Sequence, residues 1–169
     1  MIVRGVVWHL PSELWDDLNT DVILPSPYLR VPEPELGDYA FQNHLPGFTE
    51  RLDGASVVLG GTNFGCGSSR EQAVKALLQC GVTLVVAESF GSIFFRNGLN
   101  LGLALIRLPG TRSQPALAAG AEVSADLSTG IVTGVGGTAE GQPLPKTMMN
   151  IIRAGGILPL VRENPLVLG

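Results

Sequence analysis

The sequence predicts an α/β fold, and three features of its central part support that prediction. Val82–Ala87 is an apolar run of strand length with Thr83 as its one polar residue, which is typical of a strand buried on both faces of a parallel sheet. The residues before it place Ala73, Ala76 and Leu77 at helical spacing and end at Gly81, a helix stop signal. A second helix-like and strand-like pair follows the apolar run. We therefore expect alternating strands and helices that pack as layers.

The N-terminal part is expected to contribute a strand, a loop and a short helix. Val3–Leu10 is a strand candidate that ends at Pro11. Four prolines lie between residues 25 and 36, and proline lacks the N–H that regular structure needs. We therefore interpret 26–36 as an exposed loop. A short helix is expected over Asp38–Leu45, because Pro46-Gly47 would end it.

The later elements follow in chain order. Strands are expected at Ala55–Gly60, Val82–Ala87 and Leu103–Leu108, and helices from Ser68 to Cys80 and over Ser92–Leu99. Glu122–Leu127 and Gly130–Thr133 favour a hairpin, Gly134–Gln142 is expected to form turns, and Thr147–Ala154 is a final helix closed by Gly155-Gly156. No repeat or long linker divides the chain, so residues 1–169 are interpreted as one domain.

Composition indicates a compact domain with a partner. The 169 residues weigh 17.8 kDa, and 45% are apolar, too many for a disordered chain. Only 15% are charged, against roughly 25% in an average domain. A surface with so few charges suggests that part of it lies against another subunit.

The charge distribution argues against nucleic acid and for an anionic ligand. The net charge is −4, the pI is about 5.1, and Lys75 and Lys146 are the two lysines. Residues 1–53 carry a net −6, whereas residues 54–169 carry +2. An anionic ligand is therefore expected in the second part, held by arginine in particular.

Cysteine usage and hydropathy predict a cytoplasmic protein. Cys66 and Cys80 are too few for a disulfide scaffold and too few to hold a zinc or iron–sulfur site by themselves. The first ten residues lack the apolar core of a signal peptide. The longest uncharged stretch, Gly54–Ser69, is rich in glycine, so no membrane contact is expected.

The residues that carry chemistry lie between a strand and a helix, in the segment Asn63-Phe64-Gly65-Cys66-Gly67-Ser68-Ser69-Arg70-Glu71. A helix N-terminus offers free N–H groups, and Gly65 and Gly67 let a ligand approach the backbone closely. Arg70 can hold a carboxylate through two parallel hydrogen bonds. Ser68 would lie near N–H groups that stabilise an alkoxide. The pattern predicts a carboxylate or phosphate site with a hydroxyl beside the anion.

Some other interpretations of this segment are excluded, and others stay open. It lacks the lysine of a Walker A loop, the third glycine of the dinucleotide fingerprint and the G-x-S-x-G order of a hydrolase. Ser68 or Ser69 could be a helix N-cap, with Glu71 or Gln72 completing a capping box. Arg70 is unfavourable at the positive end of a helix dipole unless an anion or a nearby acid pairs with it. A non-catalytic anion-binding module is therefore the alternative of another class.

Three motifs in order resemble the swivel domain of the aconitase superfamily. They are Asn19-Thr20-Asp21-x-Ile23-x-Pro25, the segment 63–71, and Phe90-x-x-Ile93-Phe94-x-x-Asn97-x-x-Asn100-x-Gly102. More narrowly, they are similar to the separately encoded small subunits of 3-isopropylmalate dehydratase and homoaconitase. The resemblance covers residues 1 to about 108. It implies a swivelling β/β/α domain with three layers, like the aconitase C-terminal domain.

The resemblance also implies a division of labour between two subunits. A large subunit, in a heterodimer or heterotetramer, would hold a four-iron–four-sulfur cluster, so no cofactor or metal is expected on this chain. Ser68 matches the serine whose alkoxide removes and returns the substrate's C–H proton. Arg70 matches the arginine that binds a substrate carboxylate, and Ser69 the serine that helps to hold it. The net reaction moves the hydroxyl of a 2-hydroxy acid to the adjacent carbon by dehydration and rehydration.

The substrate depends on the loop 26–36, where Tyr28-Leu29-Arg30 resembles the family's specificity loop. An apolar residue there suits an isopropyl group, whereas an arginine suits a second, distal carboxylate. Three substrate assignments follow: 2-isopropylmalate in leucine biosynthesis, homocitrate in lysine biosynthesis, or a broad range of di- and tricarboxylates. Alternatively, Arg30 pairs with Glu33 or Glu35 at the surface.

Supporting roles are expected for the remaining residues of the motifs. Asn63, Gly65 and Gly67 would shape the active-site loop, 61–71, and Asn97 and Asn100 would hydrogen-bond backbone near its end.

Four further positions are assigned no part in the candidate site or are left open. Cys66 is a packing residue or a thiol whose pKa a helix N-terminus lowers. His9 and His44 are isolated from other candidate ligands in the sequence and are assigned no site. Gln72 stands where many members of the family have histidine, at a helix position outside the site.

Overall fold

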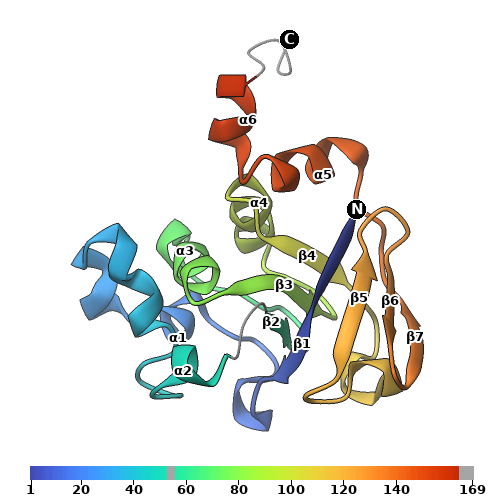
Figure 1. The fold of residues 1–169 in the computed structure, drawn as a ribbon. Coiled ribbons are helices and arrows are strands. Elements are labelled where there is room, and N and C mark those ends of the chain that lie inside the picture. Colours follow the sequence, from blue (N-terminus) through green and yellow to red (C-terminus); the bar gives the residue numbers. More distant parts are fainter. Residues whose placement is uncertain (53–55, 164–169) are drawn as a thin grey trace.

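A curled seven-stranded sheet dominates the computed structural model, which describes residues 1–52 and 56–163 (Figure 1). The strands lie in the order β4-β3-β2-β1-β5-β6-β7. Their bounds are β1 Ile2–His9, β2 Ser56–Leu59, β3 Val82–Ala87, β4 Ala104–Arg107, β5 Glu122–Asp126, β6 Ile131–Gly134 and β7 Gly137–Glu140.

The sheet has two halves that meet at β1. We call β1–β4 the parallel half, because β1 pairs with β2, β2 with β3 and β3 with β4 in parallel. The antiparallel half consists of β5–β7, and β5 pairs with β1 through Arg4 and Ser124, among others. Helices connect β2 to β3 and β3 to β4, as parallel pairing requires, whereas short turns connect β5–β7.

The helices are short and belong mostly to the parallel half. The α-helices are α1 Thr20–Ile23, α2 Phe48–Arg51, α3 Glu71–Gln79, α4 Ser92–Asn100, α5 Lys146–Arg153 and α6 Ile157–Glu163. The 3₁₀ helices are η1 Ser12–Leu14, η2 Ser26–Arg30, η3 Glu33–Tyr39, η4 Thr111–Ser113 and η5 Pro115–Leu117. α5 packs against α4, and α6 projects away from the sheet (Figure 1). No helix among the described residues has the length and apolar content to cross a membrane.

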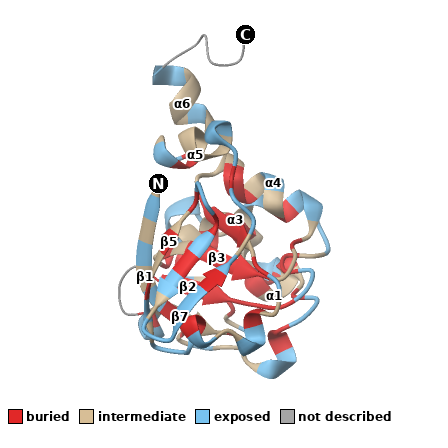
Figure 2. Ribbon diagram, turned by 90° about the vertical axis from the view of Figure 1, so that its right-hand side faces the viewer, coloured by how far each residue is buried: buried red, intermediate tan, exposed pale blue. Residues whose placement is uncertain are grey.

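Burial differs between the two halves of the sheet (Figure 2). Every residue of β2 is buried, and β3 is buried at all positions but Thr83, because both faces of the sheet are covered at these two strands. β5 instead alternates, with Val123 and Ala125 buried and Glu122 exposed. The chain after β7 then returns to the other edge, where the Gln142 N–H donates to the Arg107 carbonyl at 2.7 Å and curls the sheet toward closure.

The α/β prediction is confirmed, and the predicted strands of the parallel half lie within two residues of their observed bounds; Ala55 lies outside the described residues. Most residues of 26–36 are exposed as predicted, but the prediction that this segment has no regular structure was wrong. Prolines occupy the first turns of η2 and η3, where a missing N–H costs nothing, so two 3₁₀ helices form. The predicted helix over Asp38–Leu45 is absent: η3 ends at Tyr39 and turns follow it.

Three further predictions near the ends of elements were wrong. Gly134–Gln142 contains β7, because glycine weakens an edge strand without preventing its pairing with β6. Gly155-Gly156 closes the helix α5 as predicted, but α5 is not the final helix, since α6 follows. Ser68 is not helical either, because Arg70 keeps an extended backbone and α3 begins at Glu71.

Candidate functional site

The candidate site lies where the loops after β1, β2 and β3 meet at one edge of the sheet. Parallel strands place their carboxyl ends at the same edge, which is where α/β proteins bind ligands. The Thr20 N–H donates to the Cys66 carbonyl at 2.9 Å, and the Gly91 N–H donates to the Phe64 carbonyl at 2.9 Å. The active-site loop is therefore held on one side by the segment after β1 and on the other by the segment after β3.

The two glycines of this loop are required by packing. Gly65 and Gly67 have φ of +74° and +90°, which L-residues with side chains rarely adopt. A Cβ on Gly65 would lie 2.2 Å from Phe94 Cγ, and one on Gly67 would lie 2.5 Å from Asn19 Oδ1. The loop is thus pressed between α4 and the segment before α1.

Asn63 and its neighbour Thr62 fasten the start of the loop. Asn63 has φ of +55°; its N–H donates to Ser89 Oγ at 2.8 Å, and its Nδ2 donates to Asp17 Oδ1 at 2.8 Å. Asp16 accepts from the Thr62 N–H at 2.7 Å and from Thr62 Oγ1 at 2.9 Å. These hydrogen bonds, with a smaller contribution from Arg112, lower the pKa of the Asp16 carboxyl.

Ser68 and Ser69 are exposed immediately before α3. The helix has Arg70 as its N-cap and no side-chain cap, so the capping-box interpretation is wrong. The Ser68 carbonyl accepts a hydrogen bond from Thr20 Oγ1 at 3.0 Å, which fixes the backbone at this serine. Both hydroxyls therefore lie on the surface near a helix N-terminus without a capping role.

Arg70 is held by residues far away in the sequence. Its Nη2 lies 2.9 Å from Asp21 Oδ1 and donates to Ser26 Oγ at 3.1 Å, and its Nη1 donates to the Leu24 carbonyl at 3.4 Å. Asp21, and not Glu71, is the acid that offsets a cation at this helix terminus. Sequence reasoning missed these partners, although the Asn-Thr-Asp motif contained the signal.

The other predicted residues lie farther along their elements. Arg30 is exposed at the end of η2 and forms no ion pair within 1–52 and 56–163, while Glu33 pairs with Lys75 at 2.9 Å. Asn97 and Asn100 lie in the last turns of α4. The Asn97 carbonyl accepts from the Leu101 N–H at 2.9 Å, and in the described part of the chain neither side chain makes a hydrogen bond.

The Cys66 thiol is not activated. Burial raises its pKa, with a further increase from the Asp17 charge, and its Sγ donates to the Asp17 carbonyl at 3.1 Å. The alternative of a lowered pKa is therefore wrong. Burial also raises the pKa of Cys80, to about 12.

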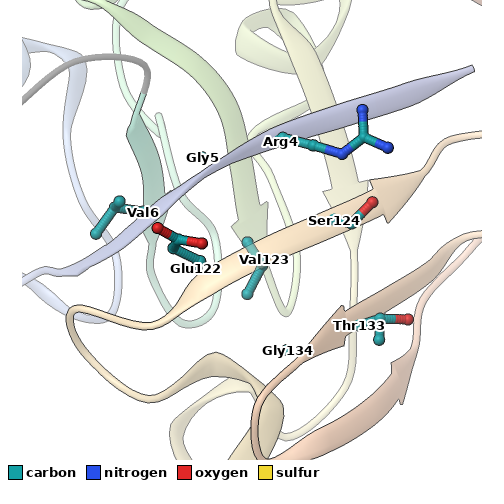
Figure 3. A pocket seen from close by; sticks show the side chains of 8 residues that line it. All are labelled: Arg4, Gly5, Val6, Glu122, Val123, Ser124, Thr133 and Gly134. Atoms are coloured by element: carbon teal, nitrogen blue, oxygen red, sulfur yellow. The ribbon is translucent and has the colours of Figure 1, made fainter.

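Two cavities differ in their chemical content. A pocket of about 220 Å³ beside the active-site loop is lined by Asn63, Cys66 and Ser92, among others. A larger cavity of about 490 Å³ lies on the exposed face of β1, β5 and β6. Figure 3 shows its Arg4 and Glu122 side chains lying apart, so they do not converge on one ligand atom.

The donor side chains in the described part of the chain do not fit an iron–sulfur cluster or another metal. Within residues 1–52 and 56–163, no three His, Cys, Asp or Glu side chains are grouped to hold a metal ion. Cys80 is buried at the C-terminal end of α3, whereas Cys66 lies in the loop before the start of that helix.

Comparison with known proteins shows which family this chain is similar to. The family model described as the aconitase C-terminal domain matches residues 44–111. The isopropylmalate/citramalate isomerase small subunit of Methanocaldococcus jannaschii is 38% identical, over 96% of this chain and 95% of its own length. The 3-isopropylmalate dehydratase small subunit of Pyrobaculum calidifontis is 41% identical, over 97% of this chain and 99% of its own length.

A solved structure shares the fold. The crystal structure described as 3-isopropylmalate dehydratase from Methanocaldococcus jannaschii superposes with a TM-score of 0.86 and 33% identity, covering 99% of this chain and 98% of that one. The seven-stranded curled sheet is thus the fold of an aconitase C-terminal-like domain. This chain belongs to the family of 3-isopropylmalate dehydratase small subunits, within the aconitase C-terminal domain family.

Proposed function

We propose that this chain is the small subunit of a hydro-lyase that converts 2-isopropylmalate to 3-isopropylmalate in leucine biosynthesis. The observation that carries the proposal is the juxtaposition at the start of α3. Two exposed serine hydroxyls precede a guanidinium that neighbouring residues hold in place. Relatives of nearly equal length bear the names of this activity's small subunit.

In this proposal Ser68 moves the proton and Arg70 binds the substrate. The Ser68 alkoxide takes the C–H proton of the 2-hydroxy acid as the hydroxyl on the neighbouring carbon leaves. It returns that proton to the carbon that lost the hydroxyl, while hydroxide adds to the carbon that lost the proton, so that the two together add one water in the opposite orientation. N–H groups before α3 stabilise the alkoxide, while Arg70 and Ser69 bind a substrate carboxylate. A four-iron–four-sulfur cluster on the large subunit would supply the Lewis acid for the hydroxyl.

A large subunit is the partner in this proposal. The relatives are named small subunits, and the low charge content leaves surface for a partner. We propose a heterodimer or heterotetramer in the cytoplasm that works on small di- or tricarboxylates.

A second candidate substrate is favoured by one observation. Arg30 is exposed and has no ion-pair partner in the described part of the chain, so its guanidinium is available to a distal carboxylate. Homocitrate, or a broad set of acids, would then be accepted. The relative named for both isopropylmalate and citramalate supports breadth within this family.

Anaerobic reconstitution with the cognate large subunit tests the proposal. Hydration of isopropylmaleate, methylmaleate and homoaconitate is measured side by side, with iron content and complex formation recorded for each preparation. We expect isopropylmaleate to give the highest kcat/KM. Preference for homoaconitate would make Arg30 the distal-carboxylate ligand. No hydration in a complex with a full cluster would refute the enzymatic proposal.

A non-catalytic module makes the opposite prediction for the isolated chain. It would bind a citrate-like acid tightly without any partner, as measured by calorimetry. We expect no such binding, because the carboxylate site in our proposal is completed by the large subunit.

A further inference from the structure

We propose that Asp21 is a positioning residue for Arg70: it holds the guanidinium where that group meets a substrate carboxylate. The inference rests on the proposed function, in which Arg70 binds the carboxylate. The 2.9 Å contact between Asp21 Oδ1 and Arg70 Nη2 joins the segment after β1 to the start of α3.

Burial makes this contact more than a surface ion pair. The Arg70 side chain is only 15% exposed, and a buried cation without a counter-charge is strongly unfavourable. Arg70 is also the N-cap of α3, where the helix dipole adds positive potential. Asp21 Oδ1 is buried as well, although the rest of the Asp21 carboxylate reaches solvent. The ion pair therefore stabilises a largely buried guanidinium that would otherwise lack a counter-charge.

The segment that places Asp21 also places Ser68. Asn19 Oδ1 accepts from the Asp21 N–H at 2.9 Å, and Thr20 Oγ1 donates to the Ser68 carbonyl at 3.0 Å. Adjacent residues of one short segment thus hold the backbone of the proposed base and the side chain of the proposed carboxylate ligand. Their relative position is set by this segment.

The geometry favours positioning over blocking. Among the described residues, Asp21 Oδ1 accepts no hydrogen bond of good geometry. It therefore attracts the guanidinium by its charge and leaves the N–H donors of Arg70 available. Leu24 and Ser26 accept one N–H each and orient the plane. A guanidinium has five N–H donors, so enough are left for a two-bond contact with a carboxylate.

Steady-state kinetics of the reconstituted holoenzyme test the proposal with isopropylmaleate. For Asp21→Asn we expect KM to rise about tenfold while kcat changes less than about threefold, because binding is lost and the proton-transfer group is intact. Asp21→Glu keeps the charge and should recover part of the KM. The matched control is Asp126→Asn, which removes an aspartate that pairs with the N-terminal amine at 3.2 Å in the antiparallel half and should leave KM unchanged.

The outcomes separate this inference from the proposed function. An unchanged KM in Asp21→Asn overturns the positioning role, and a lowered KM would show that Asp21 competes with the substrate. In an Arg70→Lys background, Asp21→Asn should add less than about twofold, since coupled residues are not additive. A full tenfold effect there would also overturn the inference.

Ser26→Ala carries the test if Asp21→Asn fails to fold. Ser26 is exposed, so its removal spares the core, and losing one Arg70 partner should raise KM about two- to threefold. An unchanged KM would contradict the proposal. A wild-type complex that turns over none of the three acids would instead refute the proposed function, and this inference with it.

Discussion

The two halves of the sheet divide packing and chemistry differently. In the parallel half β2 and β3 are covered on both faces, and the loops after β1–β3 converge on one edge, bringing together residues that are distant in sequence. The antiparallel half, together with β1, has one open face that carries the larger cavity, yet the polar side chains on this face are separated from each other along the strands. Strand direction, and not cavity size, locates the candidate site.

The largest expected effect comes from replacing Ser68 at the active-site loop, compared with replacing Ser124 in the antiparallel half. Ser68→Ala should lower kcat of the reconstituted complex by roughly 10²–10⁴-fold, the usual contribution of a general base. Ser124→Ala, in the larger cavity of the antiparallel half, should leave kcat unchanged. Iron content and complex formation are measured for both variants. Normal turnover in Ser68→Ala with a full cluster would remove Ser68 from the mechanism.

One arginine at the active-site loop and one in the larger cavity give the next largest difference. Arg70→Lys replaces a planar fork with a point charge, so KM should rise about 10- to 100-fold, the equivalent of one charged hydrogen bond. Arg4→Lys changes the larger cavity in the same way and should not alter KM. Substrate-saturation curves for the two variants decide the matter. If the KM of Arg70→Lys equalled that of Arg4→Lys, the carboxylate role of Arg70 would be refuted.

Two glycines with similar backbone angles compare the packing of the halves. Gly65 and Gly120 have φ of +74° and +78°, but a Cβ on Gly65 would strike Phe94, whereas one on Gly120 meets nothing within 4 Å. Gly65→Ala should lower the free energy of unfolding by about 2–5 kcal/mol, from overpacking added to strain. Gly120→Ala should cost only about 1–2 kcal/mol.

Urea denaturation of the two glycine variants measures these costs. Equal costs would show that the backbone angle alone requires glycine at position 65. Packing against Phe94 would then not distinguish position 65 from position 120.

The strands of the parallel half were predicted well, because a strand that is buried on both faces is recognisable as a run of apolar residues. Val82–Ala87 has no polar residue but Thr83, and Gly81 ends the helix before it with φ of +93°. The antiparallel half was harder to predict, since β7 is a four-residue edge strand with one buried residue, Ala139. The 3₁₀ helices over 26–39 could not be predicted from proline content alone, since proline both breaks helices and starts them.

The candidate site was predictable only where its residues are contiguous. The segment 63–71 could be identified as a loop followed by a helix, but the contact of Arg70 with Asp21 depends on the parallel register of β1 and β2. The raised pKa of the Cys66 thiol likewise depends on burial and on Asp17, which the sequence does not place beside it. Tertiary contacts outweighed the helix terminus in both cases.

The smallest expected effect comes from an aspartate that caps a turn in each half. Asp16 binds Thr62 at the active-site loop, and Asp126 binds Ser128 in the β5–β6 turn. Hydrogen bonds lower the pKa of both carboxyls, so the unfolded chain binds protons more readily than the folded one in acid. Each group therefore stabilises the fold above its unfolded pKa of about 4, and this stability is lost as pH falls through the folded pKa.

Replacing each of these aspartates with asparagine separates stability from activity. Both Asp16→Asn and Asp126→Asn should reduce the difference between the urea midpoints at pH 7 and pH 3, because the titrating group is gone. Asp16→Asn alone should also lower holoenzyme activity, by about two- to threefold, since the loop that carries Ser68 loses one of its fastenings. Equal activities would mean that the hydrogen bonds of Asn63 hold the loop without help from Asp16. The active-site loop would then depend on the segments that follow β1 and β3 through fewer contacts than the structure displays.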